Sequence, residues 1–306
     1  MEIMKTVDGQ IVKQTEITDD CWISLNKPTQ KEISQVSEQL NVEKDFLTAA
    51  LDDEETSRID TEDGHTLIIM DIPYISENDG LIIYETLPLA VVLTEKNIIT
   101  ICLKENNITK DFSESKIKNV YTNMKTRFLL QVLYRVATKY LFYLRQIDKR
   151  SAMVEKELHK SMKNKELIQL LDLEKSLVFF STSLKANEVT LEKILRGRYV
   201  KLYEDDKDLL EDVLIEIKQA IEMSNIYSNI LSGTMDAFAS IISNNLNIVM
   251  KVLTSITIIM AIPTMIASFF GMNMEALPIT NFWIVIIVSG ILTLVTGVLL
   301  YFKKLL

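Results

Sequence analysis

The sequence predicts an α+β membrane protein with an N-terminal α/β domain, a long helical stalk region and two C-terminal transmembrane helices. Three observations lead to this fold class. Short apolar runs alternate with turn signals up to about residue 115, a long segment without proline follows, and two uncharged apolar segments lie near the end of the chain. The length of 306 residues is enough for about two domains.

The N-terminal region, residues 1–115, is predicted to be the α/β domain. Helices are expected at 29–40, directly after Pro28, and at 43–52. Glu95-Lys96-Asn97 is typical of a hairpin turn. The apolar runs that favour strands are Cys21–Leu25, Thr66–Ile72, Leu81–Thr86, Leu89–Thr94 and Ile98–Leu103.

The next region, residues 116–248, is predicted to be the helical stalk. No proline occurs between Asp111 and Ile262, and apolar residues recur at helical spacing. The pattern predicts three helices, and the last begins at acidic residues, which suit a helix N-terminus. A helix of that length cannot be buried by its own chain, so we expect it to pack against copies of itself. The predicted helices span about 114–162, 165–196 and 205–270.

Two segments near the C-terminal end, 252–274 and 276–302, contain no charged residue and are mainly apolar. Each is long enough to cross a bilayer core of about 30 Å as a helix. The predicted boundaries are 249–272 for the first span, 273–280 for an external loop, 281–302 for the second span and 303–306 for a tail.

Charges around the spans predict their orientation. Lys251 precedes the first span, Lys303 and Lys304 follow the second, and the loop between them has no Lys or Arg. The positive-inside rule therefore places both termini in the cytoplasm. We expect a multi-pass protein of the cell membrane, either inner or plasma membrane, with most of the chain in the cytosol.

The overall composition excludes several classes of protein. The net charge is −9, from 42 acidic and 33 basic residues, which argues against a nucleic-acid-binding protein. Cys21 and Cys102 match no C-x-x-C pattern and are expected to be reduced thiols. The sequence contains no phosphate-binding loop, nucleophile elbow or metal-ligand cluster, so we do not expect an enzyme.

The segment between the spans reads Phe270-Gly271-Met272-Asn273-Met274-Glu275-Ala276-Leu277-Pro278. It resembles the signature of the CorA family of divalent-cation channels, an aromatic-Gly-Met-Asn sequence followed by Glu and Pro. Residues 244–273 also resemble the first span of that family. The resemblance implies a homopentamer in which the long helices line one pore, with a funnel-shaped cytosolic domain that senses Mg²⁺. Phe270 and Ile279 depart from the Tyr and the acidic residue that the family often has there.

Within this resemblance, Gly271, Met272 and Asn273 form the selectivity filter, and Glu275 is the charge of the external loop. Mg²⁺ demands octahedral oxygen ligands and gives up its waters reluctantly. A ring of Asn carbonyls accepts hydrogen bonds from the hydration waters without adding charge, which permits both entry and release. The alternative is that Asn273 only caps the end of the helix after Gly271.

The first span carries hydroxyls, small residues and amides at steps of three or four. We predict that this face lines the pore, and ordinary helix–helix packing is the alternative. In the resemblance, Asn247 matches a pore Asn, while Met250 and Leu253 match an apolar constriction that could gate by dewetting. The predicted pore-lining residues are Asn247, Met250, Leu253, Thr254, Thr257, Ala261, Thr264 and Ser268.

Acidic residues in the cytosolic part are candidates for regulatory Mg²⁺ ligands. The run Asp52-Asp53-Glu54-Glu55 lies where the family has an acidic site, and Asp236 matches its usual partner on the stalk. We predict Asp52, Asp53 and Asp236 as the ligands. A solvated surface charge is the alternative for each of them.

Three functions remain open. The first is a channel that moves Mg²⁺ into the cytoplasm, with Co²⁺ or Ni²⁺ as further candidate ions, gated by Mg²⁺ at the cytosolic acidic sites. The second is a ZntB-like zinc transporter, which is less consistent with Met272 because the zinc branch usually varies at that position. The third is a membrane-anchored cytosolic sensor without transport, which would have no need of a polar face ending in Asn273.

Overall fold

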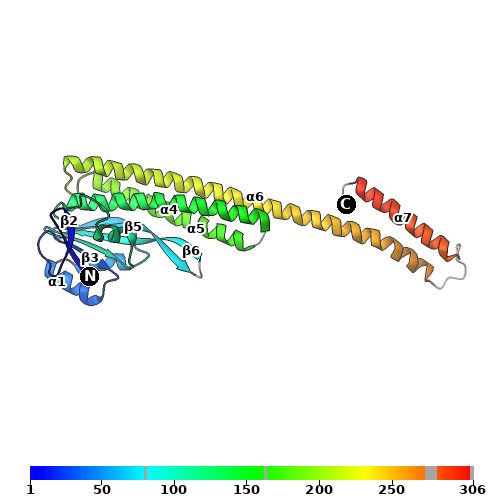
Figure 1. The fold of residues 1–306 in the computed structure, drawn as a ribbon, viewed down its shortest axis with the longest axis horizontal. Helices are drawn as coiled ribbons and strands as arrows, with labels where there is room; N and C mark the ends of the chain where they lie inside the picture. The colour runs from blue at the N-terminus through cyan, green and yellow to red at the C-terminus, as the bar shows by residue number, and fades with distance from the viewer. Residues whose placement is uncertain (79–80, 162–163, 273–280, 304–306) are drawn as a thin grey trace. The chain divides into compact units, whose positions relative to one another are not determined.

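The computed structural model describes residues 1–78, 81–161, 164–272 and 281–303 (Figure 1). The chain divides into two compact units, Met1–Gly233 and Thr234–Leu306. The boundary falls inside the longest helix, α6 (Glu204–Phe270), at a glycine. Glycine in a helix interior costs about 1 kcal/mol relative to alanine.

Among the described residues, the first unit contains a seven-stranded sheet with the order β2-β1-β3-β7-β6-β5-β4. Neighbouring strands are antiparallel except β3 and β7, which are parallel. The strands are β1 (Glu2–Val7), β2 (Gln10–Gln14), β3 (Trp22–Asn26), β4 (Arg58–Glu62), β5 (His65–Asn78), β6 (Leu81–Leu93) and β7 (Ile98–Cys102).

Helices cover both faces of this sheet (Figure 1). α1 begins with a capping box, in which Thr29 and Glu32 satisfy each other's backbone amides, and ends where Asn41 adopts a left-handed conformation with φ 52°. α5 packs on β5 and β6. The helices are α1 (Gln30–Leu40), α2 (Lys44–Thr48), the 3-10 helix η1 (Ala49–Leu51), α3 (Asn107–Ser113), α4 (Lys125–Ser161), α5 (Asn164–Leu195), α6 and, in the second unit, α7 (Phe282–Phe302).

The two faces of the sheet have separate apolar cores, because side chains alternate along each strand. On one face, Ile23 and Ile99 belong to a buried cluster that includes residues of α1 and α2. On the other face, the ring of Trp22 lies 5.1 Å from that of Phe128 at the start of α4. Its indole N–H donates to the hydroxyl of Thr100 at 2.9 Å, so burial leaves no unsatisfied donor.

The predicted helix at 29–40 and the turn at 95–97 are confirmed in position, and the predicted helix at 43–52 is divided into the short helix α2 and the 3-10 helix η1. The prediction of one helix from 114 to 162 is wrong at its start, because α4 begins at Lys125. Residues 107–113 form α3, which Asn106 caps by accepting from the amides of Ile108 and Thr109. Positive φ angles at Ser115 and Asn119 then interrupt the helical path.

The prediction of two strands at Leu81–Thr86 and Leu89–Thr94 is also wrong, since β6 is one continuous strand. Pro88 pairs with Asp71 of β5 but lies one residue beyond the pairing of β6 with β7. Its missing N–H therefore costs no hydrogen bond of the ladder.

Candidate functional site

Among the residues that the structure describes, two helices, α6 and α7, are long and apolar enough to cross a membrane. Few residues of their apolar windows are buried within the chain. Exposed apolar surface of this extent is suited to a lipid environment, in which helices satisfy their backbone hydrogen bonds internally.

One side of α6 packs against α7 within the second unit. Ser255 is only 2% exposed, and a Cβ added at Gly297 would lie 4.0 Å from Cδ1 of Ile259. Small residues four apart on α7 allow such close approach of two membrane helices. From Ser255 onward, the buried or half-buried positions on α6 are Ser255, Ile259, Ile262, Pro263, Ile266 and Phe270, and those on α7 are Val285, Ser289, Thr293, Thr296, Gly297 and Leu300.

The predicted pore-lining residues lie on the other side of α6. At about 100° per residue, their positions centre roughly 180° from those that face α7. All of them are exposed, including the large side chains of Met250 and Leu253 at 51% and 56%. The helical hairpin therefore leaves this face of α6 uncovered.

The hydroxyl groups on this face are bonded within the helix. The hydroxyls of Thr254, Thr257 and Thr264 donate to the carbonyls four residues earlier, at 2.7, 2.8 and 3.0 Å. Because each proton is used inside the helix, the oxygen lone pairs remain as acceptors on the exposed side. The face thus offers hydrogen-bond acceptors without formal charge.

The C-terminal end of α6 tightens at Gly271. The Gly271 amide donates to the carbonyls of Ala267 at 3.0 Å and Ser268 at 3.2 Å, and the Met272 amide donates to Phe269. The side chain of Met272 is 54% exposed. Asn273 and Glu275 lie outside the described residues, as does the rest of the predicted loop 273–280.

The predicted regulatory residues are all exposed. Asp52 and Asp53 follow η1, and the Asp52 carboxylate accepts from the amide of Glu54 at 3.0 Å. Asp236 is on α6, in the second unit. Within the described residues, no group of three or more His, Cys, Asp or Glu side chains comes together. One chain therefore does not assemble a complete metal site at any of these positions.

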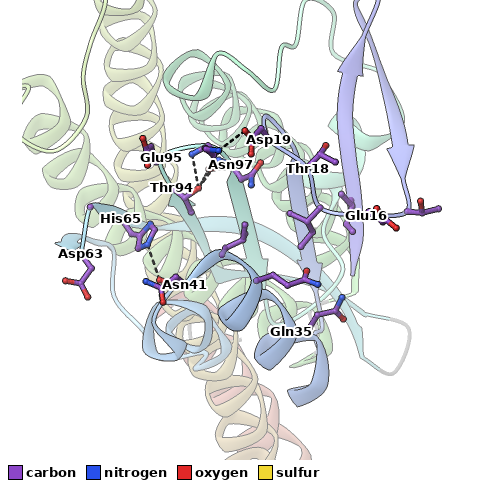
Figure 2. A pocket seen from close by; sticks show the side chains of 17 residues that line it. Glu16, Thr18, Asp19, Gln35, Asn41, Asp63, His65, Thr94, Glu95 and Asn97 are labelled. Carbon is purple, nitrogen blue, oxygen red and sulfur yellow. Dashed lines mark hydrogen bonds and ion pairs between the residues drawn. The ribbon is translucent and has the colours of Figure 1, made fainter.

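A polar cleft of about 1060 Å³ in the first unit was not predicted from the sequence (Figure 2). Asp19 is already paired with Lys96 at 2.8 Å, and a His65 ring nitrogen lies 3.2 Å from the Asn41 carbonyl oxygen. Figure 2 shows the carboxylates of Glu16 and Asp63 at separate positions around the rim. These groups do not converge on a common point, so the cleft has no metal-binding geometry.

A buried polar network joining α4 and α5 to β5 was also missed. The Asn187 amide, which is fully buried, bonds both the N–H and the C=O of Asp71, and the Tyr140 hydroxyl donates to the same C=O at 3.1 Å. Burial raises the pKa of the Asp71 carboxyl, which the Ser183 hydroxyl only partly opposes. These contacts fix the helices to the sheet and involve no metal.

Comparison with known proteins agrees with this architecture. Residues 19–304 match the family described as CorA-like Mg²⁺ transporter protein. The chain is 26% identical over 303 residues to the cobalt/magnesium transport protein CorA of Methanocaldococcus jannaschii, covering 94% of each chain.

Two solved structures share the fold. The complete structure of the CorA magnesium transporter from M. jannaschii has a TM-score of 0.82 at 24% identity, covering 99% of this chain and 96% of that one. The ZntB cytoplasmic domain from Vibrio parahaemolyticus has a TM-score of 0.62 at 12% identity, covering 80% of this chain and 97% of that one. The likeness to the complete structure confirms the predicted fold class, and the match of the family over nearly the whole sequence shows that the chain belongs to the CorA-like Mg²⁺ transporter proteins.

Proposed function

We propose that the protein is a channel that moves Mg²⁺ into the cytoplasm across the cell membrane, with Co²⁺ and Ni²⁺ as further permeant ions. Members of its family are transporters, and a relative that matches over most of its length is named a cobalt/magnesium transport protein. The observation that carries the proposal is the uncovered face of α6, with uncharged acceptors opposite the side that packs on α7.

The chemistry of this face suits a hydrated ion. Mg²⁺ keeps several of its waters, and those waters point their hydrogens outward. Threonine oxygens and the Asn273 carbonyl accept these hydrogen bonds, whereas a carboxylate ring would hold the ion too tightly for release. In this proposal Gly271, Met272 and Asn273 form the filter, and Glu275 attracts cations at the external loop.

A face on one helix encloses nothing, so the proposal requires several copies of the chain. A homopentamer, as the family resemblance implies, would place five α6 helices around one axis with α7 on the outside. Asn247 would then form an inner amide ring. Met250 and Leu253, both more than half exposed in the single chain, would form the apolar constriction.

Regulation in this proposal depends on carboxylates from different subunits. Asp52 and Asp53 of one subunit and Asp236 of the next would bind Mg²⁺ and hold the channel closed. Among the described residues of one chain no three such side chains come together, so a complete site would need ligands from a second subunit. When cytosolic Mg²⁺ falls, repulsion between these carboxylates would favour the open state, by no more than the difference in ion affinity between the states.

The proposed topology places both termini in the cytoplasm. Residues 1–115 and 116–248 form the cytosolic α/β domain and stalk, and 249–272 and 281–302 form the spans. Lys251 and Lys303, at the two ends expected to face the cytosol, support this orientation.

The experiment is ion uptake into liposomes that contain the purified full-length protein. Mg²⁺, Co²⁺, Ni²⁺ and Zn²⁺ are compared under an inside-negative potential, with and without a proton gradient. Uptake of Mg²⁺ that needs no proton gradient supports the proposal. Uptake of Zn²⁺ that depends on the proton gradient would instead support a ZntB-like transporter, and no uptake of any ion would support an anchored sensor.

A further inference from the structure

The outer face of α5 carries apolar side chains that nothing in the described chain covers. Val178, Phe179 and Val189 are 53%, 54% and 54% exposed, and Ile168 is 56% exposed. The opposite side of the same helix is buried, for example at Leu177 and Phe180. Contiguous exposed apolar surface on a helix marks an interaction site.

A second uncovered apolar face lies on the part of α6 in the first unit. Ile215, Ile226 and Ile230 are 61%, 45% and 60% exposed. Each face has apolar side chains spaced along one side of its helix, isoleucine, valine and phenylalanine on α5 and isoleucine on α6, and this spacing suits helix-on-helix packing.

The charges beside these two faces are opposite in sign. The exposed charged residues on the α5 face between 171 and 193 are Lys175, Lys185, Glu192 and Lys193. Lys175 is paired with Asp172 of the same helix at 3.8 Å, so Lys185 and Lys193 against Glu192 leave a small net basic charge. The exposed charged residues on the α6 face between 208 and 230 are Asp208, Glu211, Asp212, Lys218 and Glu222, which is a net acidic set. Complementary charges of this kind fix the partner and the register of an interface more than its affinity.

Contacts within the chain show which residues of α5 and α6 lie at the same height, meaning the same position along the common direction of the two helices. The Ser224 hydroxyl donates to the Leu177 carbonyl at 3.0 Å, and Lys218 lies 3.9 Å from Glu188. These contacts place Val189 at the height of Ile215. They also place Phe179 at the height of Ile226, and Lys193 at the height of Glu211.

We infer that the α5 face of one subunit packs on the α6 face of the next copy of the chain. Rotation about an axis parallel to the helices preserves height, so apolar residues meet apolar residues and Lys193 meets Glu211 between copies. Because the two surfaces differ, the contact is heterologous, and with the five-fold rotation of the proposed pentamer it would close into a ring. The inference rests on the proposed pentamer and assigns its cytosolic interface to named residues.

Cysteine cross-linking in the full-length protein in detergent tests this register. Val189→Cys with Ile215→Cys should give a ladder of disulfide-linked oligomers, up to the full ring, on a non-reducing gel. Cys21 and Cys102 are both buried, so the introduced thiols are the reactive ones. The control, Val178→Cys with Ile215→Cys, uses the same two faces with the cysteines about 16 Å apart in height. It should remain monomeric on the gel.

Monomer bands alone from the matched pair, or equal ladders from both pairs, would overturn the inference. A second measurement is the native mass of Phe179→Asp, which should lose the oligomer. Phe142→Asp, on α4 with a similar exposure of 51%, should keep it. A wild-type protein that is not pentameric contradicts the proposed function. A pentameric wild type whose Phe179→Asp variant is also pentameric contradicts only this interface.

Discussion

Replacing Asn187 by alanine removes the side chain that joins α5 to β5. The Asn187 side chain is 0% exposed and makes three hydrogen bonds. Its oxygen accepts from the Asp71 amide at 2.9 Å and from the Ser57 hydroxyl at 2.7 Å, and its nitrogen donates to the Asp71 carbonyl at 2.8 Å. The Asn187 side chain bonds the backbone of Asp71 where a neighbouring strand would otherwise do so, because the pairing of β4 with β5 ends at Ile69.

The expected cost follows from this geometry. Three neutral hydrogen bonds at about 0.5–1.5 kcal/mol each give roughly 1.5–4.5 kcal/mol. In the variant, the Asp71 amide can still donate to the Ser57 hydroxyl, which lies at 3.2 Å, and the Asp71 carbonyl can still accept from the Tyr140 hydroxyl, which lies at 3.1 Å. Since neither backbone group loses every partner, we expect the lower half of the range, about 1.5–3 kcal/mol of unfolding free energy.

Urea unfolding of the full-length protein in detergent measures this change. Trp22 is fully buried in the sheet, and in a Trp283→Phe background it is the only tryptophan, so its fluorescence reports the first unit. Thr182→Ala is the control, because that exposed hydroxyl bonds only within its own helix and should cost less than about 0.5 kcal/mol. If Asn187→Ala and Thr182→Ala unfold at the same urea concentration, the reasoning about the network is wrong.

Three further changes have expected outcomes. Burial raises the pKa of the Asp71 carboxyl in the folded state. The contribution of this carboxyl to stability is therefore complete below its unfolded pKa and is lost as pH rises through its folded pKa. Asp71→Asn should raise the melting temperature at pH 7.5 more than at pH 4, and an equal change at both would contradict this. Gly297→Leu should lower the melting temperature because even a Cβ would be 4.0 Å from Ile259, while Gly290→Leu, which has open space, should not; equal melting temperatures would count against the α6–α7 packing. Leu253→Ser should raise Mg²⁺ flux into liposomes by hydrating the constriction, and unchanged flux would remove Leu253 from the gate.

Strong apolar periodicity made the spans and the long helices predictable, whereas short polar strands were missed. β1, β2 and β4 each have five or six residues, and β2 is largely exposed at the edge of the sheet. Buried and exposed residues do not alternate strictly along any of the three, so the period-two signal of a strand is weak. One usable signal was overlooked, the Asp8-Gly9 pair between β1 and β2, where φ angles of 49° and 79° suit a tight hairpin.

The α6 face was predictable because residue spacing and helix geometry together determine which side chains share a side. The role of Asn187 was not, since a single Asn in a polar helical segment gives no local sign of its partner in β5, which lies 116 residues earlier. In the proposed function, Asp52 and Asp236 bind the ion together only across neighbouring subunits, so neither the sequence nor one chain determines this ligand set.

Mg²⁺ uptake by the Asn273→Ala variant tests the central claim most directly. The purified variant is placed in liposomes with an internal Mg²⁺ indicator and an inside-negative potential, beside the wild type and after its native mass has shown an intact oligomer. Loss of the Asn ring removes the acceptors for the hydration waters, so we expect uptake at the level of empty liposomes while the wild type conducts. Uptake by Asn273→Ala at the wild-type rate would contradict the filter and the channel mechanism built on it.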